Sequence, residues 1–340
     1  MPLFSIIMPC FNPGPLAAEA IRSLQRQTCP DWELVAVDDG SSDGSFRILE
    51  DWARADPRIR AVRLAQNGGA ARARNIGLSL AGGDYLCFLD ADDVLTDRAL
   101  EAFAGLVADR PVDLAKGGMA VTHAAADPVP ETVGQAWAAP RAEDARGRIL
   151  PLSDFTTHAY RRGFVEDCRI RFEEGLTVGE DRMFLARAQL WCADFAATDR
   201  VVYVYRKQHS VTMEAAWDDG KRRSTIALLT GMRALIDGRP NAARLRAAFF
   251  LNSFPWQCRL LARTARIAPR PAIDEHARAL RDAAVAGVEA ESEHARRFTG
   301  HWTAFARDMR RLLQEEAWDD AVWRLSAHAA REAAKPGRAA

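Results

Sequence analysis

The chain has 340 residues, of which 48% are apolar and 27% are charged, so it can bury a large core and is not globally disordered. Its formal net charge is zero, but the first 220 residues hold 24 basic and 33 acidic side chains, whereas the remainder holds 22 basic and 13 acidic ones. The acidic first part argues against nucleic-acid binding there, and the basic second part leaves an anionic partner or a membrane surface open.

Targeting signals and cysteine motifs are both missing from the sequence. No stretch approaches the roughly 20 apolar residues that cross a bilayer, and residues 1–9 lack the basic region of a signal peptide. The six cysteines form no CxxC pair, so neither a zinc site nor a disulfide framework is indicated. We therefore expect a cytoplasmic protein, with peripheral contact at the inner face of the membrane through the C-terminal part as an open alternative.

The first hundred residues alternate between short apolar runs and segments with helical spacing. Strands are predicted at 4–8, 33–37, 59–64 and 85–89, and helices at 16–27, 44–55, 69–80 and 96–107. Ser41, Ser42 and Asp43 are candidate N-caps for the second helix, and Thr96 is one for the fourth. Such alternation predicts βαβ units and an α/β fold with a mainly parallel sheet between helices.

The later part of the chain is less regular. Strands are predicted at 112–115 and 119–122, a long loop follows to about residue 150, and the next expected elements are a helix at 152–162, a strand at 170–172, a helix at 179–191 and a strand at 201–205. Only helical spacing remains after residue 217. We expect a catalytic domain over 1–217, a C-terminal α-helical extension over 218–334 and a frayed tail over 335–340.

Carboxylates cluster where two of the predicted strands end. Asp38 and Asp39 follow the second strand, and Asp90, Asp92 and Asp93 follow the fourth. Ligands of parallel sheets bind at the carboxyl ends of the strands, and close carboxylates repel one another unless a cation neutralises them. Oxygen ligands favour Mg²⁺ or Mn²⁺, which usually also bind the phosphates of a substrate. The pattern indicates that the protein binds a nucleotide diphosphate. For Asp38 and Asp39 alone, a turn followed by a helix cap is an equal alternative.

Two common nucleotide-binding motifs are absent. The sequence has no P-loop, and no GxGxxG follows the first strand, which disfavours ATPases of that type and NAD-dependent dehydrogenases.

Four segments together resemble the family 2 glycosyltransferases. They are SIIMPCFN at 5–12, VDDGSSD at 37–43, NGGAARARNIG at 67–77 and FLDADD at 88–93. GED at 179–181 and YRKQH at 205–209 resemble two further motifs of that family. The resemblance spans about residues 3–215 and implies a GT-A fold, that is, a Rossmann-like mixed and mainly parallel sheet with flanking helices.

The resemblance also implies roles for the donor-binding residues. Asp39 would bind the ring N–H of the base, Phe11 would stack on the base, and Pro9 would shape the base pocket. Arg74 would reach the base or the diphosphate, since its guanidinium fork fits phosphate oxygens; the alternative is a solvated helix residue. Asp90 would lie near the ribose or the metal, and Asp38 is a secondary candidate.

A metal and a base complete the expected site. The DxD residue Asp92 would hold the metal together with His209, and Asp93 is an alternative ligand. Asp181 is the candidate base that takes the proton of the acceptor hydroxyl, and Glu180 would orient the acceptor or the base. The alternative is that both acidic residues only favour the N-terminus of a helix through its dipole.

These roles predict a metal-dependent, inverting glycosyltransferase. It would move a hexosyl or N-acetylhexosaminyl group from a nucleotide-diphospho-sugar, most often a UDP-sugar, to a hydroxyl of a saccharide or lipid-linked acceptor in cell-surface polysaccharide biosynthesis. One alternative is a nucleotidyltransferase that makes nucleotide sugars, but the loop at 9–15 lacks the Lys or Arg that it requires. Another is a non-catalytic scaffold that keeps the fold.

Overall fold

The computed structural model describes residues 2–123, 127–133, 154–207, 217–239 and, within 242–288, residues 242, 257, 260, 261, 263, 264 and 268–288. The chain divides into two compact units. The first comprises residues 1–174 and 184–211, and the second comprises residues 175–183 and 212–340. None of the described helices is long and apolar enough to cross a membrane.

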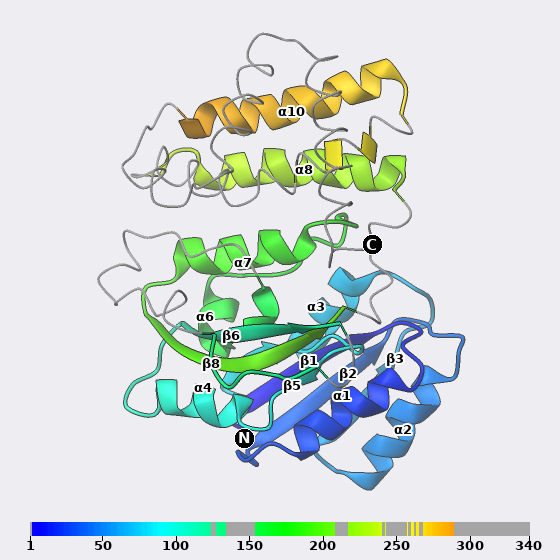
Figure 1. The fold of residues 1–340 in the computed structure, drawn as a ribbon, viewed down its shortest axis with the longest axis vertical. Helices are drawn as coiled ribbons and strands as arrows, with labels where there is room; N and C mark the ends of the chain where they lie inside the picture. Colours follow the sequence, from blue (N-terminus) through cyan, green and yellow to red (C-terminus); the bar gives the residue numbers. More distant parts are fainter. Residues whose placement is uncertain are drawn as a thin grey trace. The chain divides into compact units, whose positions relative to one another are not determined.

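The first unit is built on an eight-stranded sheet with the order β3-β2-β1-β4-β7-β6-β8-β5 (Figure 1). One half of it is wholly parallel and consists of β1 (Phe4–Cys10), β2 (Trp32–Asp38), β3 (Ile59–Arg63) and β4 (Tyr85–Phe88). These strands lie within one residue of the predicted ranges at most ends. β1, β2 and β4 are buried and mainly apolar, as in a sheet covered on both faces, whereas the edge strand β3 exposes Arg60 and Arg63.

The other half of the sheet is mixed. β7 (His158–Arg161) runs antiparallel to both β4 and β6 (Leu114–Thr122), β6 runs parallel to β8 (Phe195–Arg206), and the short β5 (Val94–Leu95) pairs antiparallel with β8. The predicted α/β fold with a mixed, mainly parallel sheet is therefore confirmed.

Helices cover both faces of the parallel half. α1 (Leu16–Gln25), α2 (Ser45–Ala55) and α4 (Ala99–Val107) share one hydrophobic core with Phe4, Ile6 and Met8 of β1. α3 (Ala70–Leu80) packs on the opposite face, where its Ala73 meets Val35 and Val37 of β2. Alternate residues of the strands thus face different helices, as a buried parallel sheet requires.

An aromatic cluster lies where the two halves of the sheet meet. Phe88 of β4 has the rings of Phe155, Tyr160, Phe172 and Phe184 around it at centroid distances of 5.3–5.6 Å. These rings come from η2 (Phe155–Thr157), β7, the loop after α6 (Arg162–Asp167) and α7 (Glu180–Trp191). Edge-to-face contacts of this kind add to the stabilisation from burial alone.

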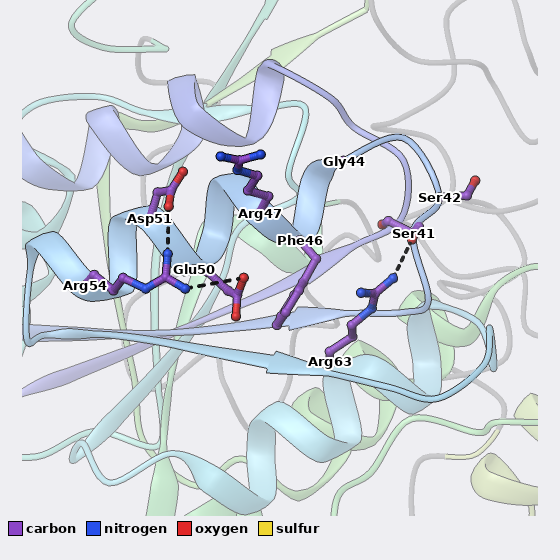
Figure 2. Close-up of a pocket in the computed structure, with 9 residues that line it drawn as sticks. All are labelled: Ser41, Ser42, Gly44, Phe46, Arg47, Glu50, Asp51, Arg54 and Arg63. Atoms are coloured by element: carbon purple, nitrogen blue, oxygen red, sulfur yellow. Dashed lines mark hydrogen bonds and ion pairs between the residues drawn. The ribbon is translucent and has the colours of Figure 1, made fainter.

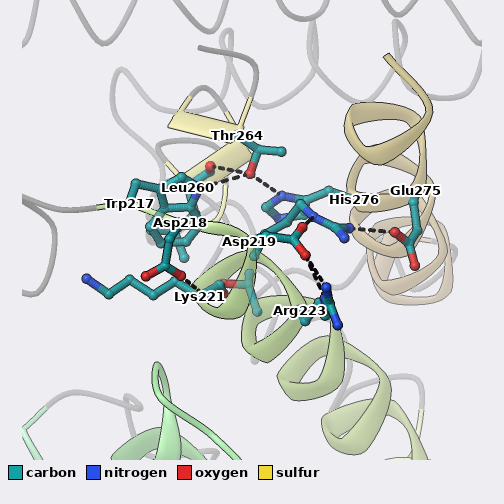
Figure 3. A network of polar contacts seen from close by, with 11 residues as sticks. Trp217, Asp218, Asp219, Lys221, Arg223, Leu260, Thr264, Glu275 and His276 are labelled. Carbon is teal, nitrogen blue, oxygen red and sulfur yellow. Dashed lines mark hydrogen bonds and ion pairs between the residues drawn. The ribbon is translucent and has the colours of Figure 1, made fainter. Parts of the chain in front are cut away.

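The second unit contains α8 (Asp219–Ile236) and α10 (Arg270–Val288), and also the first residues of α7, 180–183. Figure 3 shows the polar network that joins α8 to α10. Arg222 of α8 is 8% exposed and donates to Asp219 and to Glu275, at 2.7 and 2.5 Å. His276 of α10 is buried and contacts the hydroxyl of Thr264 at 2.9 Å.

Several sequence predictions for the mixed half are wrong. The expected helix at 152–162 is, over its described residues, the 3-10 turn η2 followed by β7, and a helix begins only at Arg162. Phe155 of η2 and Tyr160 of β7 both contribute rings to the aromatic cluster, so tertiary packing overrides the helical spacing. The predicted strand at 170–172 is irregular, and Phe172 instead supplies a ring to the same cluster.

The strands predicted at 112–115 and 119–122 are one strand, β6, which runs through Gly117 and Gly118. A Cβ atom on Gly117 would lie 2.5 Å from Val202 of β8, so this glycine permits close strand approach rather than a turn. β8 begins at Phe195, six residues before the predicted strand.

Two predicted caps are also wrong. Arg98, not Thr96, is the N-cap of α4, and Gly44 is the N-cap of α2. Asp43 nevertheless accepts the N–H of Ser45, so it satisfies one of the free donors at the start of α2.

Candidate functional site

The carboxyl ends of β1, β2 and β4 lie side by side at one edge of the sheet. The last residues of the first two strands, Cys10 and Asp38, are register partners, and the N–H of Asp39 donates to the carbonyl of Cys10 at 2.8 Å. Beyond β4, the N–H of Leu89 donates to the carbonyl of Ile7 at 3.1 Å. The loops that begin with Phe11, Asp39 and Asp90 therefore leave the sheet from neighbouring strands.

Asp39 is held at the N-terminus of α3. Its side chain is buried, and its two oxygens accept the N–H groups of Gly68 and Gly69 at 2.8 and 2.7 Å. Gly69 has a φ of +88°, which glycine adopts without strain, and it directly precedes the helix. The carboxylate thus satisfies free donors of the helix and lies at the positive end of its dipole. Each oxygen keeps a further lone pair for a ligand N–H.

Arg74, one turn further along α3, bonds the other carboxylate cluster. Its Nη2 lies 2.8 Å from Oδ1 of Asp90, and its guanidinium is 4.8 Å from the ring centre of Phe155 and 5.4 Å from that of Phe172. The Arg74 side chain is only 6% exposed, whereas that of Asp90 is 33% exposed. The alternative of a solvated helix residue is therefore wrong for Arg74. Arg74 thus fixes one oxygen of the Asp90 carboxylate, and the side chain remains partly exposed to solvent.

The DADD segment itself is a tight turn with one buried carboxylate, that of Asp93. The N–H of Asp93 donates to the carbonyl of Asp90 at 3.0 Å. The carboxylate of Asp93 is buried and accepts the hydroxyl of Tyr203 and the backbone N–H of Arg206, both at 2.7 Å. Burial, with the nearby charge of Asp90, raises the pKa of Asp93 to about 7. Asp92 is half-buried, and its carbonyl accepts from Arg206.

Tyr203 and Arg206, both on β8, support this turn, and the sequence prediction gave neither a role. The hydroxyl of Tyr203 also accepts the N–H of Asp90 at 3.2 Å, and the guanidinium of Arg206 pairs with Glu19 of α1. In the sequence, Tyr203 belongs to a predicted strand and Arg206 to the YRKQH motif. Their contacts become visible only in the structure, where β8 pairs with β5 directly after the turn.

The loop after β1 presents an aromatic ring. Phe11 is 53% exposed, which is unusual for so large an apolar side chain, and Pro9 is half-buried on β1 opposite Val37. Asn12 ties this loop to the next one, since its N–H donates to Ser41 at 3.0 Å and its Oδ1 accepts the N–H of Ser42 at 2.8 Å. An exposed ring on a fixed loop is suited to stacking on a base.

Asp38 serves the turn that follows β2. It is fully buried, accepts the N–H of Ser41 at 3.1 Å and lies 3.5 Å from Nε of Arg63. These contacts agree with the alternative that Asp38 stabilises a turn rather than binds a ligand.

The remaining predicted residues are not brought to this edge by the described contacts. Glu180 and Asp181 occupy the first turn of α7, in the part of the chain that belongs to the second unit, and Asp181 accepts the N–H of Arg182 at 2.7 Å. His209 lies outside the described residues. The roles of all three stay predictions.

The described residues fit a metal that takes most of its ligands from a substrate. They contain no group of three or more His, Cys, Asp or Glu side chains that could hold a metal ion unaided. Asp90 and Asp92 nevertheless offer partly exposed carboxylates on one tight turn. Mg²⁺ and similar hard ions commonly use one or two carboxylates together with phosphates and water, so the donor set suits such an ion.

Comparisons with known proteins agree with this geometry. Residues 5–168 match the model of Glycosyl transferase family 2. The uncharacterized glycosyltransferase EpsJ of Bacillus subtilis is 31% identical over 61% of this chain and 62% of its own length. The poly(ribitol-phosphate) beta-N-acetylglucosaminyltransferase TarS of Staphylococcus aureus is 29% identical over 63% of this chain and 37% of its own length. The matches thus cover less than two thirds of either relative.

Solved structures share the fold. The crystal structure of residues 1–349 of S. aureus TarS superposes with a TM-score of 0.69 at 18% identity, over 97% of this chain and 91% of that one. A structure of the same TarS fragment in complex with UDP-GlcNAc has the same TM-score, at 19% identity. A mannosyltransferase from Pyrobaculum calidifontis, solved with GDP-Man and Mn²⁺, superposes with a TM-score of 0.54 at 19% identity over 97% of this chain and 86% of that one. The four motifs, the GT-A sheet and the family match lead to one conclusion: residues 5–168 of the chain belong to glycosyl transferase family 2.

Proposed function

We propose that the protein is a metal-dependent, inverting glycosyltransferase that uses a UDP-sugar and assembles a cell-surface polysaccharide. The observation that carries the donor half of this proposal is the placement of α3 between two carboxylates. Asp39 bonds the N-terminus of the helix and Asp90 bonds its Arg74. One rigid element thereby sets the position of the proposed base contact relative to the proposed diphosphate contact.

Each end of the donor has a candidate partner. Phe11 would stack on the base, Pro9 would form the wall of its pocket, and a free lone pair of Asp39 would accept the ring N–H. Asp90 and Asp92 would hold Mn²⁺ or Mg²⁺, with His209 as a further ligand. The metal would supply electrostatic stabilisation of the diphosphate leaving group. Arg74 would keep Asp90 oriented.

The chemical step requires a base opposite the leaving group. Asp181 would accept the proton of the acceptor hydroxyl while that oxygen bonds to the anomeric carbon and the bond to the diphosphate breaks. Glu180 would orient the acceptor or the base. A single displacement of this kind inverts the configuration at the anomeric carbon.

The relatives support the classes of donor and acceptor. TarS is, by name, a poly(ribitol-phosphate) beta-N-acetylglucosaminyltransferase, and one of its structures contains UDP-GlcNAc. We therefore propose a hexose or N-acetylhexosamine as the transferred sugar and a saccharide, polyol phosphate or lipid-linked chain as the acceptor. Peripheral membrane contact through the basic C-terminal part belongs to the same proposal.

A hydrolysis screen tests the proposal. Purified protein is incubated with a panel of UDP- and GDP-sugars and Mn²⁺ or Mg²⁺, and released nucleotide is measured for the wild type, Asp92→Ala, Asp181→Asn and the control Asp97→Ala. We expect turnover of one UDP-sugar that needs the metal and falls about a thousandfold in Asp92→Ala. Asp97 is exposed, and among the described residues its carboxylate pairs only with Arg26, so its variant should keep wild-type turnover.

Two results would contradict the proposal. Metal-independent turnover that Asp92→Ala leaves unchanged would remove the metal role. Turnover that Asp181→Asn leaves undiminished would remove Asp181 as the base, since water takes the place of the acceptor hydroxyl in this assay.

A further inference from the structure

A polar depression lies close to the sheet edge that carries Asp39 and Asp90 (the donor edge), on the face of the sheet that α2 covers. It is a cavity of about 580 Å³ lined by residues of the loop after Asp39, of α2 and of β3 (Figure 2): Ser41, Ser42, Gly44, Phe46, Arg47, Glu50, Asp51, Arg54 and Arg63. This volume is within the range of small-molecule sites, about 300–1,000 Å³. None of these residues has a part in the proposed donor site.

This α2 groove is lined by three arginines and two acidic residues. On α2, Arg54 pairs with Asp51 at 2.9 Å and with Glu50 at 3.7 Å, so one cation faces two carboxylates. In Figure 2 Arg47 is drawn on the Asp51 side of Phe46, whereas Arg63 lies on the other side, beside Ser41. The exposed Arg47 makes no ion pair or hydrogen bond with any residue that the structure describes.

Arg63 is fixed but remains accessible. Its side chain is 53% exposed, its Nη2 donates to the carbonyl of Ser41 at 3.1 Å, and its guanidinium lies 5.1 Å from the ring centre of Phe46. Its only carboxylate neighbour in the described part of the chain is Asp38, at 3.5 Å. The guanidinium is therefore held at the groove wall with donor groups left for a ligand.

The mixture of groups defines the ligand. Guanidinium forks bind carboxylate or phosphate oxygens, hydroxyls of Ser41 and Ser42 accept and donate hydrogen bonds, and the half-buried ring of Phe46 offers a flat apolar face. We propose that the α2 groove binds an anionic stretch of a saccharide or polyol chain, with one phosphate or carboxylate at Arg47 and another at Arg63. This rests on the proposed function, since the bound chain would be the acceptor polymer.

The groove shares a loop with the proposed base pocket. Ser41 and Ser42 line the groove, and the same two residues bond Asn12, the neighbour of Phe11. A chain held in the groove is thereby attached beside the donor edge of the same unit. Its retention would favour repeated transfer to one polymer, because a tethered acceptor has a raised local concentration.

Direct binding measurements on the full chain test this inference. The probes are a fluorescent hexamer of glycerol phosphate, a trimer of galacturonic acid, neutral maltotriose and inorganic phosphate. The proteins are the wild type, Arg47→Ala, Arg47→Glu and the control Arg60→Ala, an exposed arginine of β3 that does not line the groove. We expect both anionic chains to bind and maltotriose not to bind. Affinity should fall about tenfold in Arg47→Ala, further in Arg47→Glu, and less than about twofold in Arg60→Ala.

UDP binding in the presence of Mn²⁺ is measured for the same proteins. It separates this inference from the proposed function. Arg47→Ala should bind UDP like the wild type, because Arg47 contacts neither Asp39 nor α3. Anionic chains that bind Arg47→Glu as tightly as the wild type, or do not bind the wild type, would overturn the groove while UDP binding still supports the donor site. Binding of inorganic phosphate without either chain would overturn the polymer as ligand.

Discussion

The two halves of the sheet differ in where their functional polar side chains lie. In the parallel half the polar groups of the candidate site lie beyond the strand ends, where Asp39 and Asp90 bond α3 and keep a free edge or lone pair. In the mixed half they lie within the strands and are buried, as with Tyr203 of β8, Lys116 of β6 and His158 of β7.

This difference assigns separate duties to the two halves. The parallel half presents polar groups to a ligand. The mixed half fixes the position of some of these groups, since Tyr203 and Arg206 of β8 donate hydrogen bonds to the turn that carries Asp92. A substitution in the parallel half should therefore act mainly on ligand binding, and one in the mixed half mainly on stability.

The largest effect is expected for Asp39→Ala. The substitution removes the proposed base contact and leaves the N–H groups of Gly68 and Gly69 without their carboxylate. We expect UDP affinity to fall about a hundredfold, as measured by isothermal titration calorimetry. Asp51→Ala, on the exposed side of α2, is the control and should bind UDP like the wild type. Equal affinity in Asp39→Ala and the wild type would show that Asp39 is only a helix cap.

Arg74→Lys should have the next largest effect. Lysine keeps the charge but lacks the planar fork that bonds Asp90 and lies near Phe155 and Phe172. We expect turnover of the donor to fall about thirtyfold, together with weaker Mn²⁺ dependence. Arg72→Lys, two residues away on α3, serves as the matched control. If both variants lose activity equally, the role of Arg74 as a positioning residue is wrong.

Tyr203→Phe tests the support from the mixed half. It leaves an oxygen of Asp93 and the N–H of Asp90 without their hydroxyl partner, which should cost about 2 kcal/mol in the free energy of unfolding. Tyr85→Phe, in the parallel half, loses only the contact with the N–H of Val112 and should cost less. Denaturant unfolding measures both. A larger loss of unfolding free energy in Tyr85→Phe than in Tyr203→Phe would contradict the supporting role of the mixed half.

The smallest effect is a pH dependence from His158. Burial, with the charge of Lys116, lowers the pKa of this histidine to about 3, whereas an unfolded histidine titrates near pH 6.5. The unfolded chain therefore binds the extra proton first, so this contribution to stability is complete above about pH 6.5 and is lost as the pH falls. Between pH 7.5 and 5.8 the wild type should lose about 1 kcal/mol more than His158→Gln.

A matched variant in the second unit sharpens this last prediction. His276 is also buried with its pKa lowered to about 3, beside Arg222, so His276→Gln should flatten the stability profile in the same pH window. Identical profiles for the wild type and both variants would contradict the buried, neutral state of the two rings.

The parallel half could be predicted from the sequence because its signals are local. Continuous apolar runs, turn residues and helical spacing gave β1 to β4 and α1 to α3 with small errors at their ends. The motif residues Asp39, Asp90 and Asp92 follow strand ends, so the rule for parallel sheets already grouped them at one edge. The sequence did not reveal that α3 bonds both clusters, since this depends on side-chain distances.

The mixed half could not be predicted in the same way. The residues at 155–160 have helical spacing but form a turn and a strand, because the Phe88 aromatic cluster favours that path. Likewise, the adjacent glycines of β6 suggest a turn until Val202 of β8 is seen against Gly117. Long-range pairing decides both cases, and neither contact is visible in a local window of sequence.

The most direct test of the central claim, that α3 couples Asp39 to Asp90 in one donor site, is a double-mutant cycle on UDP affinity in the presence of Mn²⁺. The cycle compares the wild type, Asp39→Asn, Asp90→Asn and the double variant. The coupling predicts that the two losses are non-additive by at least about 1 kcal/mol, as for residues that share one network. Losses that add within about 0.3 kcal/mol, or variants that bind UDP like the wild type, would contradict it.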